Sequence, residues 1–179
     1  MLDEIFRWAG AKPHMHVLDL GIGTGSLSAR FIRRECAVWG VDFSARMLAK
    51  AREKLPNVRL LRAELLDDWP AELRRRFDRV VSAYVFHEFD LEAKIRPLQK
   101  IALQHLTDDG RILVGDVAFE TADARAEAER LRAEVWDEEE FYWAADETIA
   151  ACERAGLRAA YRQVSTVAGV FAFTHSQAT

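Results

Sequence analysis

The sequence predicts an α/β fold with a mostly parallel sheet, because apolar runs of strand length alternate with longer stretches of helical spacing. A glycine-rich turn follows the first apolar run, and two β-rich runs end the chain. The length of 179 residues suits one domain, expected over 1–179, better than two. The expected parallel strands cover residues 16–20, 37–42, 58–63, 78–84 and 111–117.

The first half of the chain places a helix before and between these strands. Apolar residues recur at helical spacing ahead of the first strand, and Gly10 and Pro13 end that helix. A second helix is expected over 26–34. Ser44 is expected to cap a third helix, which ends at Pro56.

The second half predicts three more helices and an antiparallel hairpin. Helices are expected over 92–106, 121–140 and 146–157, of which 121–140 is charged and Ala-rich and so is expected to be solvated. Asp-Asp-Gly at 108–110 predicts a turn into the fifth strand. The β-rich runs 159–166 and 168–176 are joined by a short connection, so they must pair as an antiparallel hairpin at the sheet edge.

Composition excludes several function classes. A net charge of −4 gives no basic surface for nucleic acid. The N-terminus lacks the cationic start of a signal peptide, and nowhere do 18 apolar residues run together. We therefore expect a cytoplasmic protein with a small-molecule partner and without nucleic-acid or membrane partners. Cys36 and Cys152 are far apart and outside any Cys/His cluster, so no metal site is predicted.

The glycine turn carries the main functional signal. Gly21, Gly23 and Gly25 end a strand and open a helix, an arrangement that points backbone N–H groups at a ligand. Their spacing differs from the G-x-G-x-x-G of dinucleotide sites, and a fixed charge on Asp19 would suit a positively charged ligand. Asp42 ends the second strand, where a carboxylate can accept from both ribose hydroxyls. The alternatives are an NAD site and a turn that needs only positive φ.

With these residues the chain resembles the class I methyltransferases that use S-adenosylmethionine. Segments 19–25 (DLGIGTG) and 40–44 (GVDFS) match the two signatures of that family, and 106–116 (LTDDGRILVGD) matches its approach to the fifth strand. The resemblance covers nearly the whole chain. It implies a Rossmann-like three-layer sandwich, with a mostly parallel seven-stranded sheet and an antiparallel C-terminal hairpin. It also implies S-adenosylmethionine as cofactor, with S-adenosylhomocysteine as product.

The resemblance implies roles for individual residues. Asp42 would bind the ribose hydroxyls, and Phe43 and Met47 would flank the adenine. Glu64 would accept from the adenine amino group. The complete set of residues expected to bind the cofactor is Asp19, Gly21, Gly23, Thr24, Gly25, Asp42, Phe43, Met47, Glu64, Leu65 and Tyr84.

A narrower likeness is to small bacterial methyltransferases of the YrrT type. Their fourth strand ends in a Ser-x-Tyr-x-Phe-His run, matched by 82–87, and an acid precedes an aromatic pair, matched by 140–142. Relatives usually carry a further N-terminal segment that closes over the site, whereas this chain begins almost at the first helix. Three alternatives stay open: the lid is absent, residues 136–143 and a second subunit of a homodimer replace it, or the chain has been shortened.

His87 is the candidate catalytic residue, because it lies where the fourth strand should end. It could be a general base or a group that orients the substrate, and Glu88 and Asp116 lie at similar edges. An aromatic group accompanies the acidic run 137–140 and could either wall the substrate site or pack an added helix onto the sheet. That group is Trp136, Phe141, Tyr142 and Trp143.

The predicted function is transfer of a methyl group to a small-molecule acceptor by in-line displacement, an EC 2.1.1 activity. A sulfonium is already an activated leaving group, so the protein mainly aligns donor and acceptor and excludes water. A base is needed only if the acceptor must lose a proton first, and the sequence does not name the acceptor. The alternative is a catalytically idle protein that binds S-adenosylmethionine or S-adenosylhomocysteine as a sensor or partner subunit; an NAD-dependent enzyme is a distant third.

Overall fold

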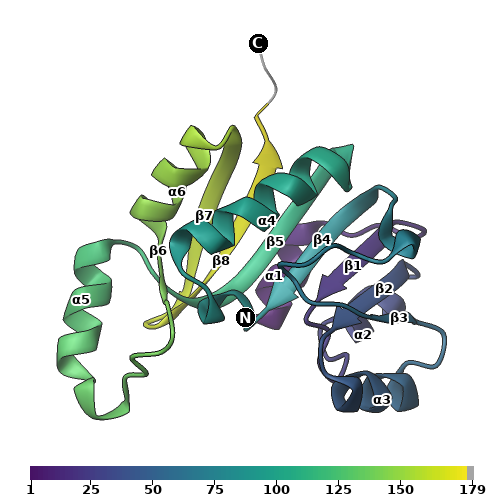
Figure 1. The fold of residues 1–179 in the computed structure, drawn as a ribbon, viewed down its shortest axis with the longest axis horizontal. Helices are drawn as coiled ribbons and strands as arrows, with labels where there is room; N and C mark the ends of the chain where they lie inside the picture. The colour runs from purple at the N-terminus through teal and green to yellow at the C-terminus, as the bar shows by residue number, and fades with distance from the viewer. Residues whose placement is uncertain (177–179) are drawn as a thin grey trace.

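The computed structural model describes residues 1–176 and confirms the mostly parallel sheet (Figure 1). Its strands are β1 (His16–Leu20), β2 (Ala37–Asp42), β3 (Arg59–Arg62), β4 (Phe77–Ala83), β5 (Leu106–Phe119), β6 (Trp143–Ala144), β7 (Leu157–Ser165) and β8 (Ala168–His175). Seven strands form the path β3-β2-β1-β4-β5-β8-β7, and the short β6 pairs with the end of β5. The first five strands of the path are parallel, whereas β8 is antiparallel to both neighbours.

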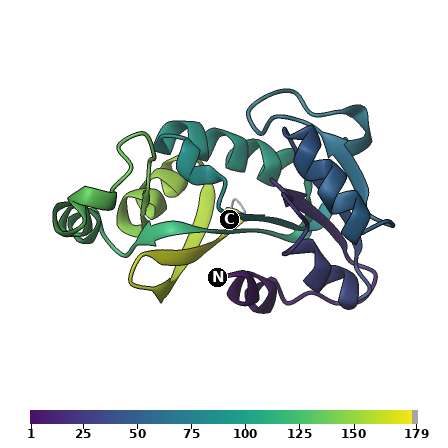
Figure 2. The same ribbon diagram turned by 90° about the horizontal axis from the view of Figure 1, so that it is seen from below.

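Helices cover both faces of the sheet, as the view from below makes clear (Figure 2). They are α1 (Leu2–Ala9), α2 (Ser28–Arg33), α3 (Ala45–Lys54), α4 (Leu91–Gln104), α5 (Ala122–Leu131) and α6 (Ala145–Arg154), with single 3-10 turns at Ala71–Leu73, Phe86–Glu88 and Ala133–Val135. One core cluster packs α1 and α2 on the sheet, and a second packs α4 and α6 on the other face. Val17 of β1 joins the first cluster and Leu18 the second, since successive strand residues face opposite sides.

Local signals start and end the helices where the sequence indicates. Gly10 ends α1 in the left-handed region, with φ 56°, which costs glycine no steric strain. The Ser44 hydroxyl accepts from the Met47 N–H and so caps α3. Within residues 1–176, no helix is both long enough and apolar enough to cross a membrane.

Two expectations about the second half are wrong. The helix expected over 121–140 is the shorter α5, followed by a 3-10 turn and an irregular segment. A helix of 20 residues would carry the chain about 30 Å, whereas it must return for Trp143 to pair with Ala118. The turn expected at 108–110 lies inside β5 as an irregularity, because Phe77 pairs with Leu106 and Arg79 with Arg111.

Candidate functional site

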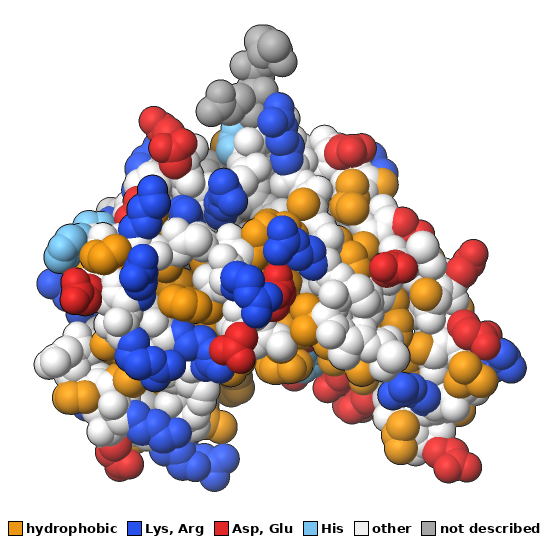
Figure 3. Space-filling model, turned by 180° about the vertical axis from the view of Figure 1, so that it is seen from behind, with side chains coloured by type: hydrophobic (Ala, Val, Ile, Leu, Met, Phe, Trp, Pro, Cys, Tyr) orange, Lys and Arg blue, Asp and Glu red, His pale blue; other side chains and the backbone are white. Residues whose placement is uncertain are grey.

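The carboxyl ends of the parallel strands meet along one edge of the sheet, the place where open α/β sheets bind ligands. Leu20, Asp42, Arg62 and Ala83 end β1, β2, β3 and β4 at this edge. In the space-filling view, a notch separates the lobe that carries α3 from the lobe that carries α5 (Figure 3). Most of the residues predicted to bind a cofactor directly follow these strand ends.

The glycine loop connects β1 to α2 and contacts the end of β2. Gly21, Gly23 and Gly25 all have positive φ, at 67°, 53° and 82°, which residues with a Cβ rarely adopt. The Gly23 N–H donates to Asp42 Oδ2 at 2.8 Å, and the Ser44 N–H donates to Asp42 Oδ1 at 2.8 Å. The Asp42 carboxylate therefore orders the loop and the start of α3 together.

At two of the three glycines a neighbouring side chain leaves no room for a Cβ, whereas the space around the third is open. A Cβ on Gly21 would lie 2.3 Å from Val85 Cγ2, and one on Gly25 would lie 2.4 Å from Leu55 Cδ1. A Cβ on Gly23 would meet nothing closer than 3.9 Å. Turn geometry and packing thus account for Gly21 and Gly25, while Gly23 is the position that a ligand could approach.

Asp19 lies beneath the loop and is almost inaccessible to solvent. Its carboxylate accepts from the Ser28 hydroxyl of α2 at 2.6 Å. Burial raises the pKa of Asp19 to about 7, and the hydrogen bond from Ser28 offsets only part of that effect. The charge expected to be fixed at this position is therefore only partly present near neutral pH.

The buried Asp19 predicts a measurable pH dependence of stability. Because its pKa is higher in the folded protein than its ordinary 3.8, the folded state binds the proton more tightly. This contribution is fully present below about pH 4 and is lost as the pH rises to about 7. Between about pH 5 and about pH 8, the wild type should lose about 3 kcal/mol more unfolding free energy than Asp19→Asn. Urea unfolding at both pH values tests this, and equal losses in the two proteins would contradict it.

Beyond Asp42, the structure brings some of the predicted cofactor residues together and separates one. Phe43 is 62% exposed, and with Glu64 it lines a shallow hollow of about 350 Å³. Met47 in the first turn of α3 and Thr24 in the glycine loop are both half-buried. Leu65 instead packs against the core and lines a separate groove with residues of α4.

Tyr84 marks the end of β4 with an unusual backbone conformation. Its φ is 59°, its side chain is half-exposed, and its N–H donates to the Gly115 carbonyl. A non-glycine residue in this region is a strained position, of the kind that clusters at functional sites. The next residue, Val85, packs on Gly21, so the end of β4 lies directly against the glycine loop.

His87 follows this strained turn and is held by a buried carboxylate. Asp116 of β5 is fully buried and accepts from His87 Nδ1 at 2.7 Å and from the His87 N–H at 3.0 Å. It also accepts from the Val117 N–H and from Trp143 Nε1. The hydrogen bond that His87 donates to Asp116 raises the pKa of His87, although burial opposes the shift. Because a carboxylate only accepts, Nδ1 keeps its proton, and in the neutral ring Nε2 carries the free lone pair.

Two further carboxylates, those of Glu88 and Glu140, face Nε2 of His87. His87 Nε2 lies 3.6 Å from Glu88 Oε1 and 3.6 Å from Glu140 Oε1. Glu140 lies in the segment after α5. The backbone of the next residue, Phe141, fixes the position of this segment. The Phe141 N–H donates to the His87 carbonyl at 2.7 Å, and the Phe141 carbonyl accepts from Lys94 Nζ of α4.

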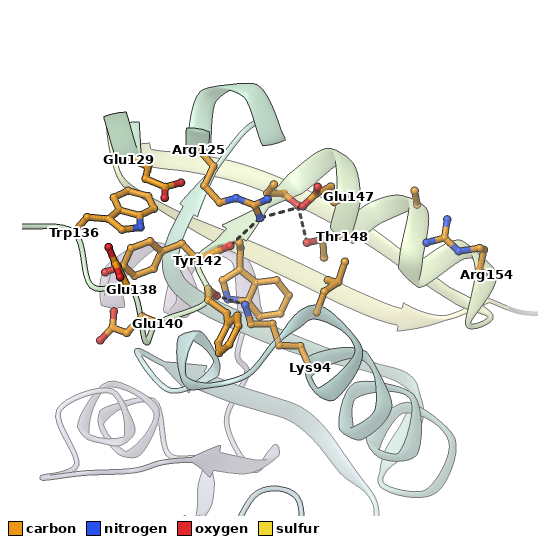
Figure 4. Close-up of a pocket in the computed structure, with 15 residues that line it drawn as sticks. Lys94, Arg125, Glu129, Trp136, Glu138, Glu140, Tyr142, Glu147, Thr148 and Arg154 are labelled. Carbon is orange, nitrogen blue, oxygen red and sulfur yellow. Dashed lines mark hydrogen bonds and ion pairs between the residues drawn. The ribbon is translucent and has the colours of Figure 1, made fainter. Parts of the chain in front are cut away.

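The aromatic group of 136–143 divides between the two roles considered for it. Trp143 is 1% exposed and packs on Phe171 and Phe173, so it is a core residue. The other three rings are more exposed and, together with Trp143, line a groove of about 960 Å³ between α4, α5 and α6 (Figure 4). Trp136 and Tyr142 pack edge to face there, with ring centres 4.7 Å apart.

Sequence reasoning missed Lys94, which lies 4.4 Å above the Trp143 ring and is almost fully buried. Burial lowers the pKa of Lys94 to about 8. A signal was present, since Leu91, Lys94 and Leu98 share the buried side of an amphipathic helix. Glu140 was matched within a motif, but no local pattern places it beside His87.

Comparison with known proteins identifies relatives for most of the chain. A family model described as a methyltransferase domain matches residues 17–110. An uncharacterized methyltransferase of Geobacillus kaustophilus (strain HTA426) is 31% identical over 172 residues, which cover 90% of this chain and 77% of the relative. Another, from Alkaliphilus oremlandii (strain OhILAs), is 29% identical over 110 residues, which cover 62% of this chain and 49% of the relative. The chain spans about half the length of the first curated relatives that it matches.

Solved structures with the same fold match nearly the whole chain at low sequence identity. Magnesium protoporphyrin IX methyltransferase from Synechocystis PCC 6803, solved with bound SAH, superposes with a TM-score of 0.77 at 18% identity, covering 98% of this chain and 82% of that one. The mitomycin 7-O-methyltransferase MmcR superposes with a TM-score of 0.72 at 20% identity, covering 97% of this chain and 53% of that one.

Proposed function

The chain belongs to the class I S-adenosylmethionine-dependent methyltransferase family, and from that premise we propose that it transfers a methyl group to a small-molecule acceptor. The observation that carries the proposal is the hydrogen bond from Gly23 to Asp42 at the carboxyl edge of the sheet. It joins an open, positive-φ glycine loop to a carboxylate that can accept from a ribose. The SAH bound to the Synechocystis neighbour supports the choice of cofactor.

The proposed cofactor orientation follows the edge of the sheet. The ribose lies at Asp42, and the adenine lies in the hollow beside Phe43 and Glu64. The sulfonium end then points past Gly23 and Tyr84 toward the end of β4. This places the transferable methyl group on the side of the site where His87 lies.

The chemistry asked of the protein is mainly alignment. The methyl carbon bonded to the sulfonium sulfur is already activated. Methyl transfer therefore needs an acceptor atom placed in line with the breaking carbon–sulfur bond, and a site from which water is excluded. If the acceptor carries a proton, His87 Nε2 is the group placed to act on it, because Asp116 holds its Nδ1 proton. The groove beside Glu140 gives the acceptor room to extend away from the cofactor.

The first experiment is a calorimetric titration of the chain with S-adenosylmethionine, S-adenosylhomocysteine and NAD in parallel. Micromolar binding of the first two without NAD supports the proposal and justifies a screen of small-molecule acceptors. Binding of NAD alone would overturn it. Turnover with any acceptor separates an enzyme from a protein that only binds the nucleoside.

Asp42→Ala should weaken S-adenosylhomocysteine binding by about 10- to 100-fold. The substitution removes the carboxylate proposed to accept two charge-assisted hydrogen bonds from the ribose, and it leaves the Gly23 N–H without its acceptor. Titration calorimetry measures the change. Asp108→Ala removes an exposed carboxylate near the amino end of β5 and should leave the affinity unchanged. Equal affinities for Asp42→Ala and the wild type would mean that the ribose binds elsewhere.

A further inference from the structure

The geometry points to a divalent transition-metal site formed by His87, Glu88 and Glu140. Within residues 1–176, this is the group of His, Cys, Asp and Glu side chains whose donor atoms lie close enough to share an ion, all within 4.8 Å of one another. The inference deepens the proposed function and rests on it in one respect: the ion would face the place assigned to the methyl acceptor.

The distances between the donor atoms are longer than hydrogen bonds and close to the separation of two ligands on one ion. His87 Nε2 lies 3.6 Å from one oxygen of Glu88 and 3.6 Å from one oxygen of Glu140, which is too long for either hydrogen bond. Nitrogen and oxygen ligands held about 2.1 Å from one ion at tetrahedral corners lie about 3.4 Å apart. The two separations from His87 are thus close to those between ligands of one ion, and all three donor atoms lie within 4.8 Å of one another.

The buried carboxylate behind the histidine is a second and independent observation. Metal-binding histidines commonly donate their other ring N–H to a carboxylate, which fixes the tautomer and the direction of the ring. Asp116 does this for His87 at 2.7 Å, and three other N–H groups hold Asp116 in turn. In the neutral ring, Nε2 thus presents its lone pair toward Glu88 and Glu140.

Hydrogen bonds to the backbone of the neighbouring residue also fix the position of Glu140. Its neighbour Phe141 is hydrogen-bonded through the N–H to His87 and through the carbonyl to Lys94. Figure 4 shows Lys94 reaching from α4 toward the segment that carries Glu140 and Tyr142. The buried lysine therefore acts as a positioning residue, because it holds the backbone that brings the second carboxylate to the histidine.

One imidazole and two carboxylates suit ions such as Zn²⁺, Mn²⁺ or Co²⁺. Three protein ligands leave at least one coordination position open, as in catalytic zinc sites. An acceptor oxygen or nitrogen bound there would be fixed in place opposite the methyl donor. In the metal-bound form Nε2 is a ligand and takes no proton, so His87 then acts by holding the ion.

The test titrates metal-free protein with Zn²⁺ by calorimetry and with Co²⁺ by visible absorbance. The wild type should bind one ion per chain with a micromolar or lower Kd, and Glu140→Gln should weaken binding at least about tenfold. Glu138→Gln is the matched control, since Glu138 is an exposed carboxylate lining the same groove and should leave the Kd unchanged.

The wild type failing to bind either ion would overturn the inference, and so would equal Kd values for the wild type and Glu140→Gln. S-Adenosylhomocysteine titrations of the same proteins keep the two proposals apart. Nucleoside binding without metal binding leaves the proposed function standing and removes the metal site. Metal binding without nucleoside binding keeps the metal site and removes the proposed function.

Discussion

Replacing His87 with alanine should lower turnover by about 10²- to 10⁴-fold once an acceptor is found, with little change in S-adenosylhomocysteine affinity. The reason is location: Nε2 is proposed to face the acceptor side of the site, whereas most of the predicted cofactor contacts lie on the glycine loop and after the ends of β2 and β3. Both proposed actions of Nε2, on a proton or on a metal ion, are lost with the ring. The expected change is therefore in turnover and not in cofactor binding.

Initial-rate kinetics and calorimetry on the same protein preparations measure the two effects separately. His175→Ala is the control, because His175 is an exposed histidine at the far end of β8, away from the carboxyl edge. It should match the wild type in both assays. Normal turnover in His87→Ala would reduce His87 to a structural residue that holds the Phe141 N–H through its carbonyl.

Replacing Trp143 with alanine should cost about 3–5 kcal/mol of unfolding free energy. The indole is buried against Phe171 at 4.9 Å and Phe86 at 5.9 Å between ring centres. Its removal leaves a cavity, takes the aromatic face from the Lys94 ammonium, and deletes a donor to Asp116.

Urea unfolding tests this cost, and Trp136→Ala provides the comparison from the same aromatic group. Trp136 is half-buried and packs against Tyr142 at the groove, so its removal should cost about 1 kcal/mol or less. Trp143→Phe, which keeps an aromatic ring but no N–H, should fall between the two. Equal losses for Trp143→Ala and Trp136→Ala would contradict the separation of core and groove.

Sequence patterns predicted the parallel half of the fold well, because its signals are local. The bounds of β1 and β2 agree to the residue, since buried parallel strands are continuous apolar runs between turns. The Ser44 cap and the C-terminal hairpin have equally local causes. Such patterns depend only on residues that are close in the sequence, so they can be recognised without knowledge of the tertiary fold.

The part of the candidate site around His87 could be predicted only in part. The end of β4 directed attention to His87, but the bonds that define its state come from distant segments. Asp116 lies on the next strand, and Glu140 arrives only because the chain turns back after α5 and Phe141 bonds to His87. The return path depends on β6 pairing with β5 and on Lys94, and neither has a periodic signal over the charged segment 121–140.

The helix α5 buries none of its side chains, although it joins strands whose residues are largely buried. A segment without buried apolar contacts opens locally at far lower free energy than the sheet to which it is attached. Its amide hydrogens should therefore exchange with deuterated solvent well before those of β5. Substitutions in α5 should then change the width of the groove proposed for the acceptor while leaving the folding of the sheet almost untouched.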